Sequence, residues 1–598
     1  MAELLKSADE KLVDFVTLEF DRYKRYHAKT FEDAEKYYNF WVGKPPKRDW
    51  DWQNQVPVPM MIEGEQTISP RLFVALFPNE TPVDVKVEGD TDPQQGIKIK
   101  YLLHHYFRVS DVQSAFAAAL PQCTLYGTAY LEGGSWFVRK GWVTDDNGNR
   151  REATIESRPD CRPVNFFEIY PHPAKLRVDD GLPLIRRRVC DAGFLRALMD
   201  NPFFKTDNLT KALNTDFPDA IKDPNAKPHE YFEILEYWGP YDEDVIDKTN
   251  NKVTTRKAVP WWCIVINRKV VIRSIPNPYN HQLPPFVKIK LFQDSKPNWF
   301  GVGIGMIGSP TNERLNKMVN QRLDNVDLVL NRQGVYNGND PLIDKKRLQI
   351  SRPGKFYKVS DVLTSIKFLD IPDVTASSYK EEELAKEYFR QATGATSSLS
   401  PADSDEQHRT AMGIQLLQGA AGARFKPVLR CMEQDGIQQL AMMYFSNLKQ
   451  FMTNDEWILI TGSNGTTEPV LVTPEDIQAK VFFIPMGISE TVNKELQVGQ
   501  LLRFKELTMD DPTVNRQEIN RRIAELFGFK DVQKLLTPIN MQSDNQLMTG
   551  QNKLKIQQRI AEGASPEQIK EEMMGPPPIT EGPQVAQQLM APQEGGAQ

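Results

Sequence analysis

The chain has 598 residues, which at roughly 150 residues per domain allows about four domains and excludes a small protein with one core. Its 73 Lys and Arg residues against 79 Asp and Glu residues give a formal net charge of −6. Since tight binding of nucleic-acid phosphates requires an excess of cations, we expect any contact with DNA to be weak or local. The 40% of hydrophobic and 25% of charged residues are typical of a globular chain in water, and the 42 prolines predict many loops.

The cysteines and the N-terminus indicate the compartment. Five scattered cysteines form no CxxC pair, which argues against a disulfide framework and a thiolate zinc site and favours a reducing environment. The first residues contain no apolar segment behind a basic start, so we expect neither a signal peptide nor an anchor. The longest uncharged stretch, Val112 to Leu131, contains two glutamines and Pro121 and is a poor membrane span. We therefore predict a protein of cytosolic origin.

Helices are predicted in the first quarter of the chain. Apolar residues recur at helical spacing over residues 3–28 and again over 31–41, before a stretch that begins with Gly43 and contains two prolines. We expect two amphipathic helices there. Another helix is expected from Ser114, stopped or kinked at Pro121 and resuming toward the tyrosine and glycine that follow.

The region from about 135 to 295 is predicted to be mixed α+β. SWFVRKGWVTD and REATIESRP flank the turn signal Asp146-Asn147-Gly148 and predict a β-hairpin. Runs rich in β-branched and aromatic residues then recur between Pro, Asn and Gly clusters, and they predict further strands: YFEILEYW, WWCIVINRKVVIRSI and FVKIKLF.

A helix with a polar stripe is predicted next. Ser309 offers an N-cap and Pro310 the first helical residue, and the helical pattern continues to about Asn331. Three asparagines four residues apart form an uncharged stripe beside the apolar one: Asn312, Asn316 and Asn320. On the sequence alone, contact with a partner and exposure to water explain this stripe about equally well.

Short strands and a second pair of helices follow. LIDKKRLQI and GKFYKVSD carry strand signals, and a charged helix is expected from about Ala376 to Gln391. After a loop of small polar residues, a long helix should begin near Gln407. Pro427 should kink this helix, because proline cannot donate to the carbonyl of Ala423.

The last part of the chain combines strands, helices and a low-complexity end. WILI, VLV and AKVFFIPM predict strands after about Met452, and helices are expected from Glu490 to about Ala564. The final segment is dominated by Pro, Gln and Gly, which predicts disorder.

A literal GxGxxG occurs at Gly303, Gly305 and Gly308 and suggests a dinucleotide site. A true fingerprint places the glycine turn directly after a strand and within βαβ units, whereas here QDSKPNW intervenes and no second such unit follows. We favour close packing at the start of a helix. A nucleotide-binding enzyme that uses this motif remains the alternative from another class.

Other catalytic signatures are missing from the sequence. There is no GxxxxGK[ST] loop, no HExxH pair and no GxSxG elbow, and the seven histidines show no paired ligand spacing. The acidic runs DSDE and DED lie along predicted loops, where solvated charges are the simpler explanation. We expect no catalytic residues, no metal and no cofactor.

The order of four motifs resembles that of the portal proteins of tailed double-stranded DNA bacteriophages. In that family a Gly-rich turn leads into a helix with Asn and Gln, a Pro-Gly strand unit follows, an acidic helix ends in Thr-Gly, and Thr-Ala opens a long helix. The matching positions here are Gly301 to Asn331, Pro353-Gly354, Thr393-Gly394 and Thr410-Ala411. The similarity is good over about 300–450, moderate over 110–300 and weak at both ends. The acidic DSDE departs from the glycine often found after that Thr-Gly.

The resemblance implies an α+β, portal-like subunit with a helical stem, a small α/β clip, a mixed α+β wing with a long kinked helix, and a helical crown. Its implied divisions are N-terminal wing helices at 1–45, an α+β wing at 46–300, a stem helix at 301–331, a clip at 332–375, a second stem helix at 376–392, a tunnel loop at 393–406, a long wing helix with strands at 407–489, a crown at 490–565 and a disordered tail at 566–598.

The resemblance also implies a function. A portal is a ring, probably of 12 subunits, at one capsid vertex of the virion, assembled in the host cytoplasm, and it is the channel for genome packaging and ejection. The implied partners are the terminase large subunit, head–tail adaptor and tail proteins, major capsid and scaffolding proteins, and the double-stranded DNA that passes through, with no membrane. A monomeric tail or scaffold adaptor is a further alternative.

Two sets of residues are implied as contact sites. The tunnel loop contains no Lys or Arg, so small polar groups there would touch DNA without gripping it: Thr396, Ser397, Ser398 and Ser400. The clip offers cations for docking partners: Lys345, Lys346, Arg347 and Arg352.

Overall fold

The computed structural model describes residues 7–77, 82–88, 92–144, 150–199, 201, 203–215, 231–242, 244–246, 253–255, 258–331, 333–344, 346, 356, 358–369, 372, 375–395, 424–461, 467–485, 501–508 and 516–526. The chain divides into two compact units. The first comprises Met1–Ile460 and Glu468–Asn493, and the second comprises Thr461–Thr467 and Lys494–Gln598. Helices and antiparallel sheets are both abundant, which confirms the predicted α+β class.

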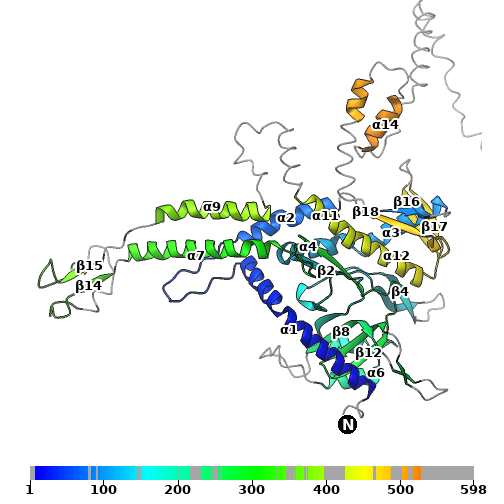
Figure 1. The fold of residues 1–598 in the computed structure, drawn as a ribbon, viewed down its shortest axis with the longest axis horizontal. Helices are drawn as coiled ribbons and strands as arrows, with labels where there is room; N and C mark the ends of the chain where they lie inside the picture. Colours follow the sequence, from blue (N-terminus) through cyan, green and yellow to red (C-terminus); the bar gives the residue numbers. More distant parts are fainter. Residues whose placement is uncertain are drawn as a thin grey trace, which may run out of the picture. The chain divides into compact units, whose positions relative to one another are not determined.

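Ten α-helices are described in the first unit (Figure 1): α1 Ala8–Val42, α2 Met60–Leu76, α3 Pro93–Val109, α4 Val112–Tyr126, α5 Ala192–Ala197, α6 Thr206–Leu213, α7 Ile304–Leu330, α9 Thr375–Thr393, α11 Lys426–Met432 and α12 Gln439–Phe451. A π-helical segment, Glu433–Gln438, joins α11 to α12. In the second unit the structure describes α14, Arg516–Leu526, and a helical run at residues 501–507.

The strands form small sheets. Their bounds are β1 Val83–Val87, β2 Thr128–Glu132, β3 Trp136–Thr144, β4 Arg150–Pro159, β5 Arg162–Val164, β6 Ile169–Pro171, β7 Leu184–Asp191, β8 Tyr231–Tyr241, β9 Asp244–Ile246, β10 Val253–Thr255, β11 Val259–Ile266, β12 Val270–Pro276, β13 Phe286–Lys290, β14 Gly334–Tyr336, β15 Ile366–Phe368, β16 Glu456–Thr461, β17 Thr467–Val472 and β18 Val481–Pro485. The sheet orders are β12-β11-β8-β7-β6, β13-β2-β5, β3-β4, β1-β18, β16-β17, β9-β10 and β14-β15.

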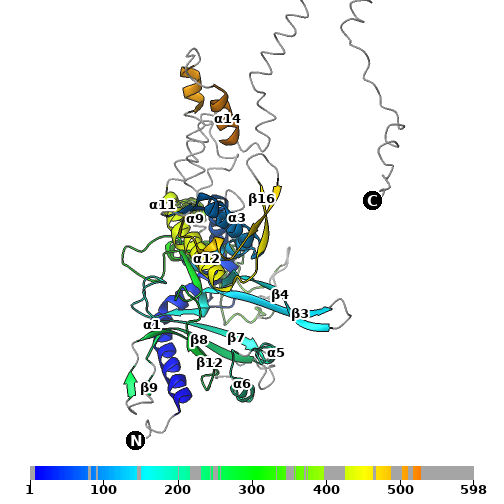
Figure 2. The same ribbon diagram turned by 90° about the vertical axis from the view of Figure 1, so that its right-hand side faces the viewer.

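The five-stranded sheet is covered on both faces (Figure 2). One face packs against α1 through a cluster that includes Val16, Phe20 and Tyr237. The other face packs against α5 and α6 through residues such as Leu209 and Ile264. Because both faces are buried, most strand positions are apolar, and charged residues pair across neighbouring strands, as Arg187 does with Glu233 and Arg188 with Glu236.

The N-terminal helix differs from the prediction. Ser7 and Glu10 form a reciprocal capping box at its start, and Gly43 ends it in the left-handed conformation with φ 74°. Residues 8–42 form one continuous helix, so the prediction of two helices was wrong. The apolar face that buries Phe20 and Ala34 runs without interruption, and packing along this whole face favours continuity.

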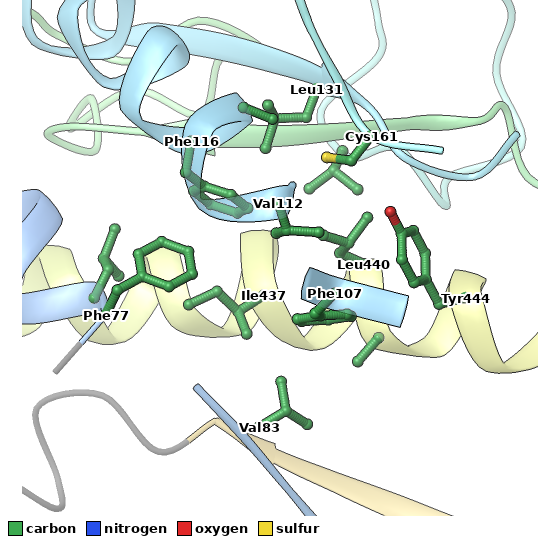
Figure 3. Packing of buried hydrophobic residues seen from close by; sticks show 14 of the residues in the cluster. Phe77, Val83, Phe107, Val112, Phe116, Leu131, Cys161, Ile437, Leu440 and Tyr444 are labelled. Atoms are coloured by element: carbon green, nitrogen blue, oxygen red, sulfur yellow. The ribbon is translucent and has the colours of Figure 1, made fainter. Parts of the chain in front are cut away.

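The largest core lies where α3, α4 and the α11–α12 segment meet the three-stranded sheet (Figure 3). Phe116 of α4, Phe107 of α3 and Tyr444 of α12 are almost fully buried in it. Gly436 of the π-helical segment approaches Ile289 of β13, and a Cβ there would lie 2.8 Å from that side chain. The π-helical segment, with its wider i→i+5 hydrogen bonds, therefore lies where the helix passes close to the sheet.

Several strand predictions are confirmed. The hairpin β3–β4 pairs Trp136 with Pro159 and Thr144 with Arg150. The run WWCIVINRKVVIRSI folds as β11 and β12, joined by a tight turn in which Asn267 and Arg268 both have positive φ. The strands predicted at FVKIKLF and after Met452 are present as well.

Three boundaries around the later helices require correction. First, α7 begins at Ile304, so Ser309 and Pro310 lie inside the helix and do not start it. Second, the strands between α7 and α9 are β14 and β15, which flank the predicted runs LIDKKRLQI and GKFYKVSD; the described residues of those runs are not in strands. Third, Pro427 lies in the first turn of α11, where a missing N–H costs little, and the predicted helix over 407–423 falls outside the described residues.

Candidate assembly site on helices α7 and α9

Helices α7 and α9 lie side by side and antiparallel (Figure 1). Their buried contacts include Leu315 of α7 with Ala385 and Phe389 of α9, and these join Met60 and Met61 of α2 in one cluster. An ion pair between α7 and α9 adds to these apolar contacts. Arg322 lies 2.6 Å from Glu382, and its guanidinium stacks 4.2 Å above the ring of Tyr379.

Glu382 is the centre of this charged contact. Its second oxygen lies 2.6 Å from Lys386, one turn along α9. The hydrogen bond from Lys386, helped by Arg322, holds the pKa of Glu382 below its usual range. The carboxylate therefore stays ionised at neutral pH and keeps the two helices in register.

The asparagine stripe is buried against the chain's own extended segment 54–58. Asn320 accepts a hydrogen bond from the Val56 N–H at 2.7 Å and donates to the Val56 carbonyl at 2.9 Å. Asn316 accepts from the Val58 N–H at 2.7 Å. The stripe therefore faces neither water nor another subunit, and the two sequence-based explanations are both replaced by an intrachain contact.

The spacing of the asparagines follows from two repeat lengths. Alternate residues of an extended chain are about 6.6 Å apart, and four residues of an α-helix rise about 6 Å. One asparagine per helical turn can therefore bind every second residue of an extended segment. The prolines at 57 and 59 lack N–H groups and favour extended backbone, which leaves Val56 and Val58 to present their amides.

These hydrogen bonds between α7 and segment 54–58 form a ladder with two distinct ends. At one end, Asn54 donates its backbone N–H to Asp324 at 2.7 Å and its side-chain amide to Asp327 at 2.7 Å. At the other end, Asn312 is fully buried, and neither side-chain atom has a hydrogen-bond partner in the part of the chain that the structure describes. The next residue in the register is Met60, where α2 begins and the extended segment stops.

The first turns of α7 explain the GxGxxG pattern. A Cβ on Gly303 would lie 2.3 Å from the Gly127 backbone nitrogen, and one on Gly305 would lie 2.6 Å from the ring of Tyr37. A Cβ on Gly308 would lie 2.2 Å from the ring of Phe389. Protein atoms thus occupy the space that a phosphate would need, and the predicted close packing is observed.

Two ion pairs fix this helix pair to the rest of the first unit. Arg390 of α9 donates two hydrogen bonds to one oxygen of Glu63 on α2, at 2.9 and 2.7 Å. Lys36 of α1 donates to Glu313 of α7 at 2.8 Å. All four side chains are more than a third exposed, so each pair stabilises the attachment only modestly.

The far end of the pair is closed by a polar network around Asp340. Its carboxylate accepts hydrogen bonds from the Ser360 N–H at 2.9 Å, the Leu342 N–H at 3.0 Å and the Ser365 hydroxyl at 2.6 Å, and from the Ser360 hydroxyl as well. These hydrogen bonds, led by that from the Ser360 side chain, hold the pKa of Asp340 well below its usual range. The network closes the loop between β14 and β15.

Large apolar side chains are uncovered along this region. On α7 and α9, Leu330, Leu384 and Tyr388 are each at least half exposed. Beyond the helices, four further large apolar side chains are at least 60% exposed: Phe356, Val362, Leu363 and Phe368. Exposed apolar groups that gather into one patch are typical of a contact surface.

The predicted contact residues fall mostly outside the described part of the chain. The tunnel-loop residues Thr396, Ser397, Ser398 and Ser400 lie there, as do Lys345, Arg347 and Arg352 of the predicted docking set. Lys346 is described and exposed, and its backbone N–H donates to Asp344 at 3.0 Å. The 54–58 segment was missed, although its alternating prolines opposite an Asn repeat are a usable signal.

Among the described residues, no cluster of three or more His, Cys, Asp or Glu side chains has the geometry of a metal site. Within the same residues, no helix is long and apolar enough to cross a bilayer.

Comparison with known proteins gives a family match. The model of a family described as phage SU10 portal protein matches residues 191–573, more than half of the chain. No curated protein matches the sequence. Among solved structures, a chain from the neck of an empty GTA particle computed with C6 symmetry aligns with a TM-score of 0.35 and 11% identity, covering 79% of this chain and 90% of that chain.

Proposed function

The chain belongs to the phage SU10 portal protein family, and on that premise we propose that it assembles into a ring of 12 subunits at one vertex of the capsid. This ring is the channel through which the genome is packaged and later ejected. Double-stranded DNA passes through it, and the net charge of −6 favours sliding over tight phosphate binding.

The proposed parts of the subunit follow the family order. Helices α7 and α9 are the stem, residues 332–375 the clip, residues 393–406 the tunnel loop, and residues 490–565 the crown. Residues 1–300 with 407–489 form the wing, and 566–598 are a tail. The paired, antiparallel α7 and α9 and the short β14–β15 unit between them support the stem and clip assignments.

The exposed apolar residues at the far end of α7 and α9 support the proposal that other phage proteins bind there. A single subunit leaves Phe356, Val362 and Leu363 almost fully exposed, which is unfavourable unless another protein covers them. We assign this surface to the terminase large subunit during packaging and to head–tail adaptor or tail proteins afterwards. The major capsid and scaffolding proteins contact other parts of the ring.

The family is a structural component of the virion, and we propose no enzymatic activity, metal or cofactor for this chain. Electron microscopy of the purified protein tests the ring directly. End-on class averages should show a central channel with twelve-fold symmetry. Monomers that remain monomeric at high concentration and with scaffolding protein present would count against it and favour a monomeric adaptor.

A further inference from the structure

Two tryptophans stand out on the loop 43–59 between α1 and α2. Trp50 is 66% exposed and Trp52 is 52% exposed. Tryptophan is among the side chains that contribute most when a protein interface covers them. Nothing in the α7–α9 packing or in the asparagine ladder uses these two rings.

The turn that carries the tryptophans is ordered. The side-chain oxygen of Gln53 accepts from the backbone N–H groups of Asp49 and Trp50, at 2.8 and 3.0 Å. Arg48 donates to the Asp51 carbonyl at 2.6 Å. Asn54 follows at once and is bonded to α7. The rings are thus presented by a turn whose ordering cost is already met before any partner binds.

A complementary face lies on α9. Leu384 and Tyr388 are one helical turn apart, so they share a face, and they are 50% and 59% exposed. Exposed Glu383 and Glu387 flank them at the same spacing. This face lies about 100° around the helix from the one that packs Ala385 and Phe389 against α7 and α2.

The charges around the two surfaces are opposite. The loop carries three exposed cations and two exposed carboxylates, a net charge of +1: Lys44, Lys47, Arg48, Asp49 and Asp51. The α9 face carries the two glutamates and one exposed lysine a turn before Leu384, Lys380, which gives a net charge of −1. An aromatic pair on a loop of net positive charge and an apolar pair on a face of net negative charge are complementary in polarity and in the sign of their net charge.

The two surfaces are not in contact within one chain, because both remain exposed while the loop is held on α7. We propose that they meet between copies: Trp50 and Trp52 of one subunit pack on Leu384 and Tyr388 of the next. Lys44 and Lys47 then lie against Glu383 and Glu387. Each subunit carries one surface of each kind, so the contact is head-to-tail and can close into a ring.

This inference rests on the proposed ring and names one contact within it. The experiment mixes two single-cysteine variants, Trp52→Cys and Leu384→Cys, in a background where the five native cysteines are replaced by serine or alanine. Oxidation of the mixture should give a cross-linked dimer that neither variant forms alone. A mixture of Trp142→Cys with Leu384→Cys is the matched control, because Trp142 is 74% exposed on a different element.

Assembly provides the second measurement. The double variant Trp50→Ala, Trp52→Ala should raise the protein concentration needed for half-assembly by about tenfold or more, with unchanged thermal unfolding of the monomer. Trp142→Ala should leave assembly unchanged. The reversal Lys44→Glu, Lys47→Glu should weaken assembly, and Glu383→Lys, Glu387→Lys in the same chain should restore it.

The outcomes separate the two levels of the proposal. If the Trp50→Ala, Trp52→Ala variant forms rings normally and the mixture of Trp52→Cys with Leu384→Cys gives no cross-link, this contact is overturned and the proposal of a ring is unaffected. If the chain without substitutions forms no rings and the mixture of Trp52→Cys with Leu384→Cys gives no cross-link, both the contact and the ring are overturned. Loss of binding to another phage protein or to DNA in the tryptophan variant, with ring assembly unchanged, would assign the loop to that partner and refute the contact between copies.

Discussion

Replacing Asn320 with alanine should loosen the attachment of segment 54–58 to α7 without unfolding the subunit. Asn320 makes three hydrogen bonds: one from the Val56 N–H, one to the Val56 carbonyl and one to the Asn316 carbonyl. In the variant, both polar groups of the Val56 backbone lose their partner. Helix α7 itself keeps its packing through Leu315 and its own backbone hydrogen bonds.

The magnitude follows from the hydrogen-bond count and the exposure of the segment. Each hydrogen bond is worth about 1 kcal/mol net, which gives roughly 3 kcal/mol for the three. Val56 is 44% exposed, so water replaces part of this once the segment lifts. We expect a local loss of about 1–2 kcal/mol, which corresponds to roughly 5- to 30-fold more frequent opening of this segment.

Hydrogen exchange measures this opening directly. Amides of a peptide that covers residues 54–58 should exchange faster in Asn320→Ala, and to a smaller extent in Asn316→Ala, while peptides from α4 are unchanged. Gln321→Ala is the matched control, because it removes an exposed amide from the next position of the same helix. Equal exchange in the Asn320 and Gln321 variants would refute the ladder as the element that holds this segment.

Three further perturbations test other parts of the structure. Gly308→Ala places a methyl group 2.2 Å from the ring of Phe389 and should lower the unfolding free energy by about 1–3 kcal/mol, partly recovered when Phe389→Leu is added; a stable single variant would contradict the close packing. Burial lowers the pKa of Lys288 to about 6, so between pH 6 and the usual lysine pKa the unfolded chain binds a proton that the folded chain does not, and the free energy of unfolding rises with pH. In urea unfolding, Lys288→Met should show a smaller rise of this free energy between pH 6.5 and 9. An unchanged rise would exclude Lys288 as its source. Asp340→Asn turns one accepting oxygen into a donor, so limited proteolysis within 333–369 should accelerate, whereas equal cleavage rates would show that the network does not hold the β14–β15 loop.

Much of the local structure followed from residue patterns. A turn signal located the hairpin β3–β4. Runs rich in β-branched and aromatic residues located the strands β8, β11, β12 and β13, because such side chains fit a pleated, buried surface. Helical spacing located α9, and motif order indicated the family to which the chain belongs. These features depend on neighbours in sequence, so they can be seen without the fold.

The errors arose where distant residues decide the outcome. The start of α7 was placed six residues late, because Ser309-Pro310 is a good local helix start. Packing against Gly127, Tyr37 and Phe389 extends the helix back to Ile304. The break expected near residue 29 is absent because α1 packs along one continuous apolar face.

The sequence by itself determined the class of the fold, many of its helices and about half of its described strands, and the asparagine repeat on α7. Only the tertiary structure decided what that repeat contacts, because an amide side chain satisfies water, a partner or its own backbone equally well until the chain brings one of them near. Segment 54–58 is more than 250 residues away in sequence and yet lies on α7. The same folding left Trp50 and Trp52 exposed beside it, and no local pattern could have shown that.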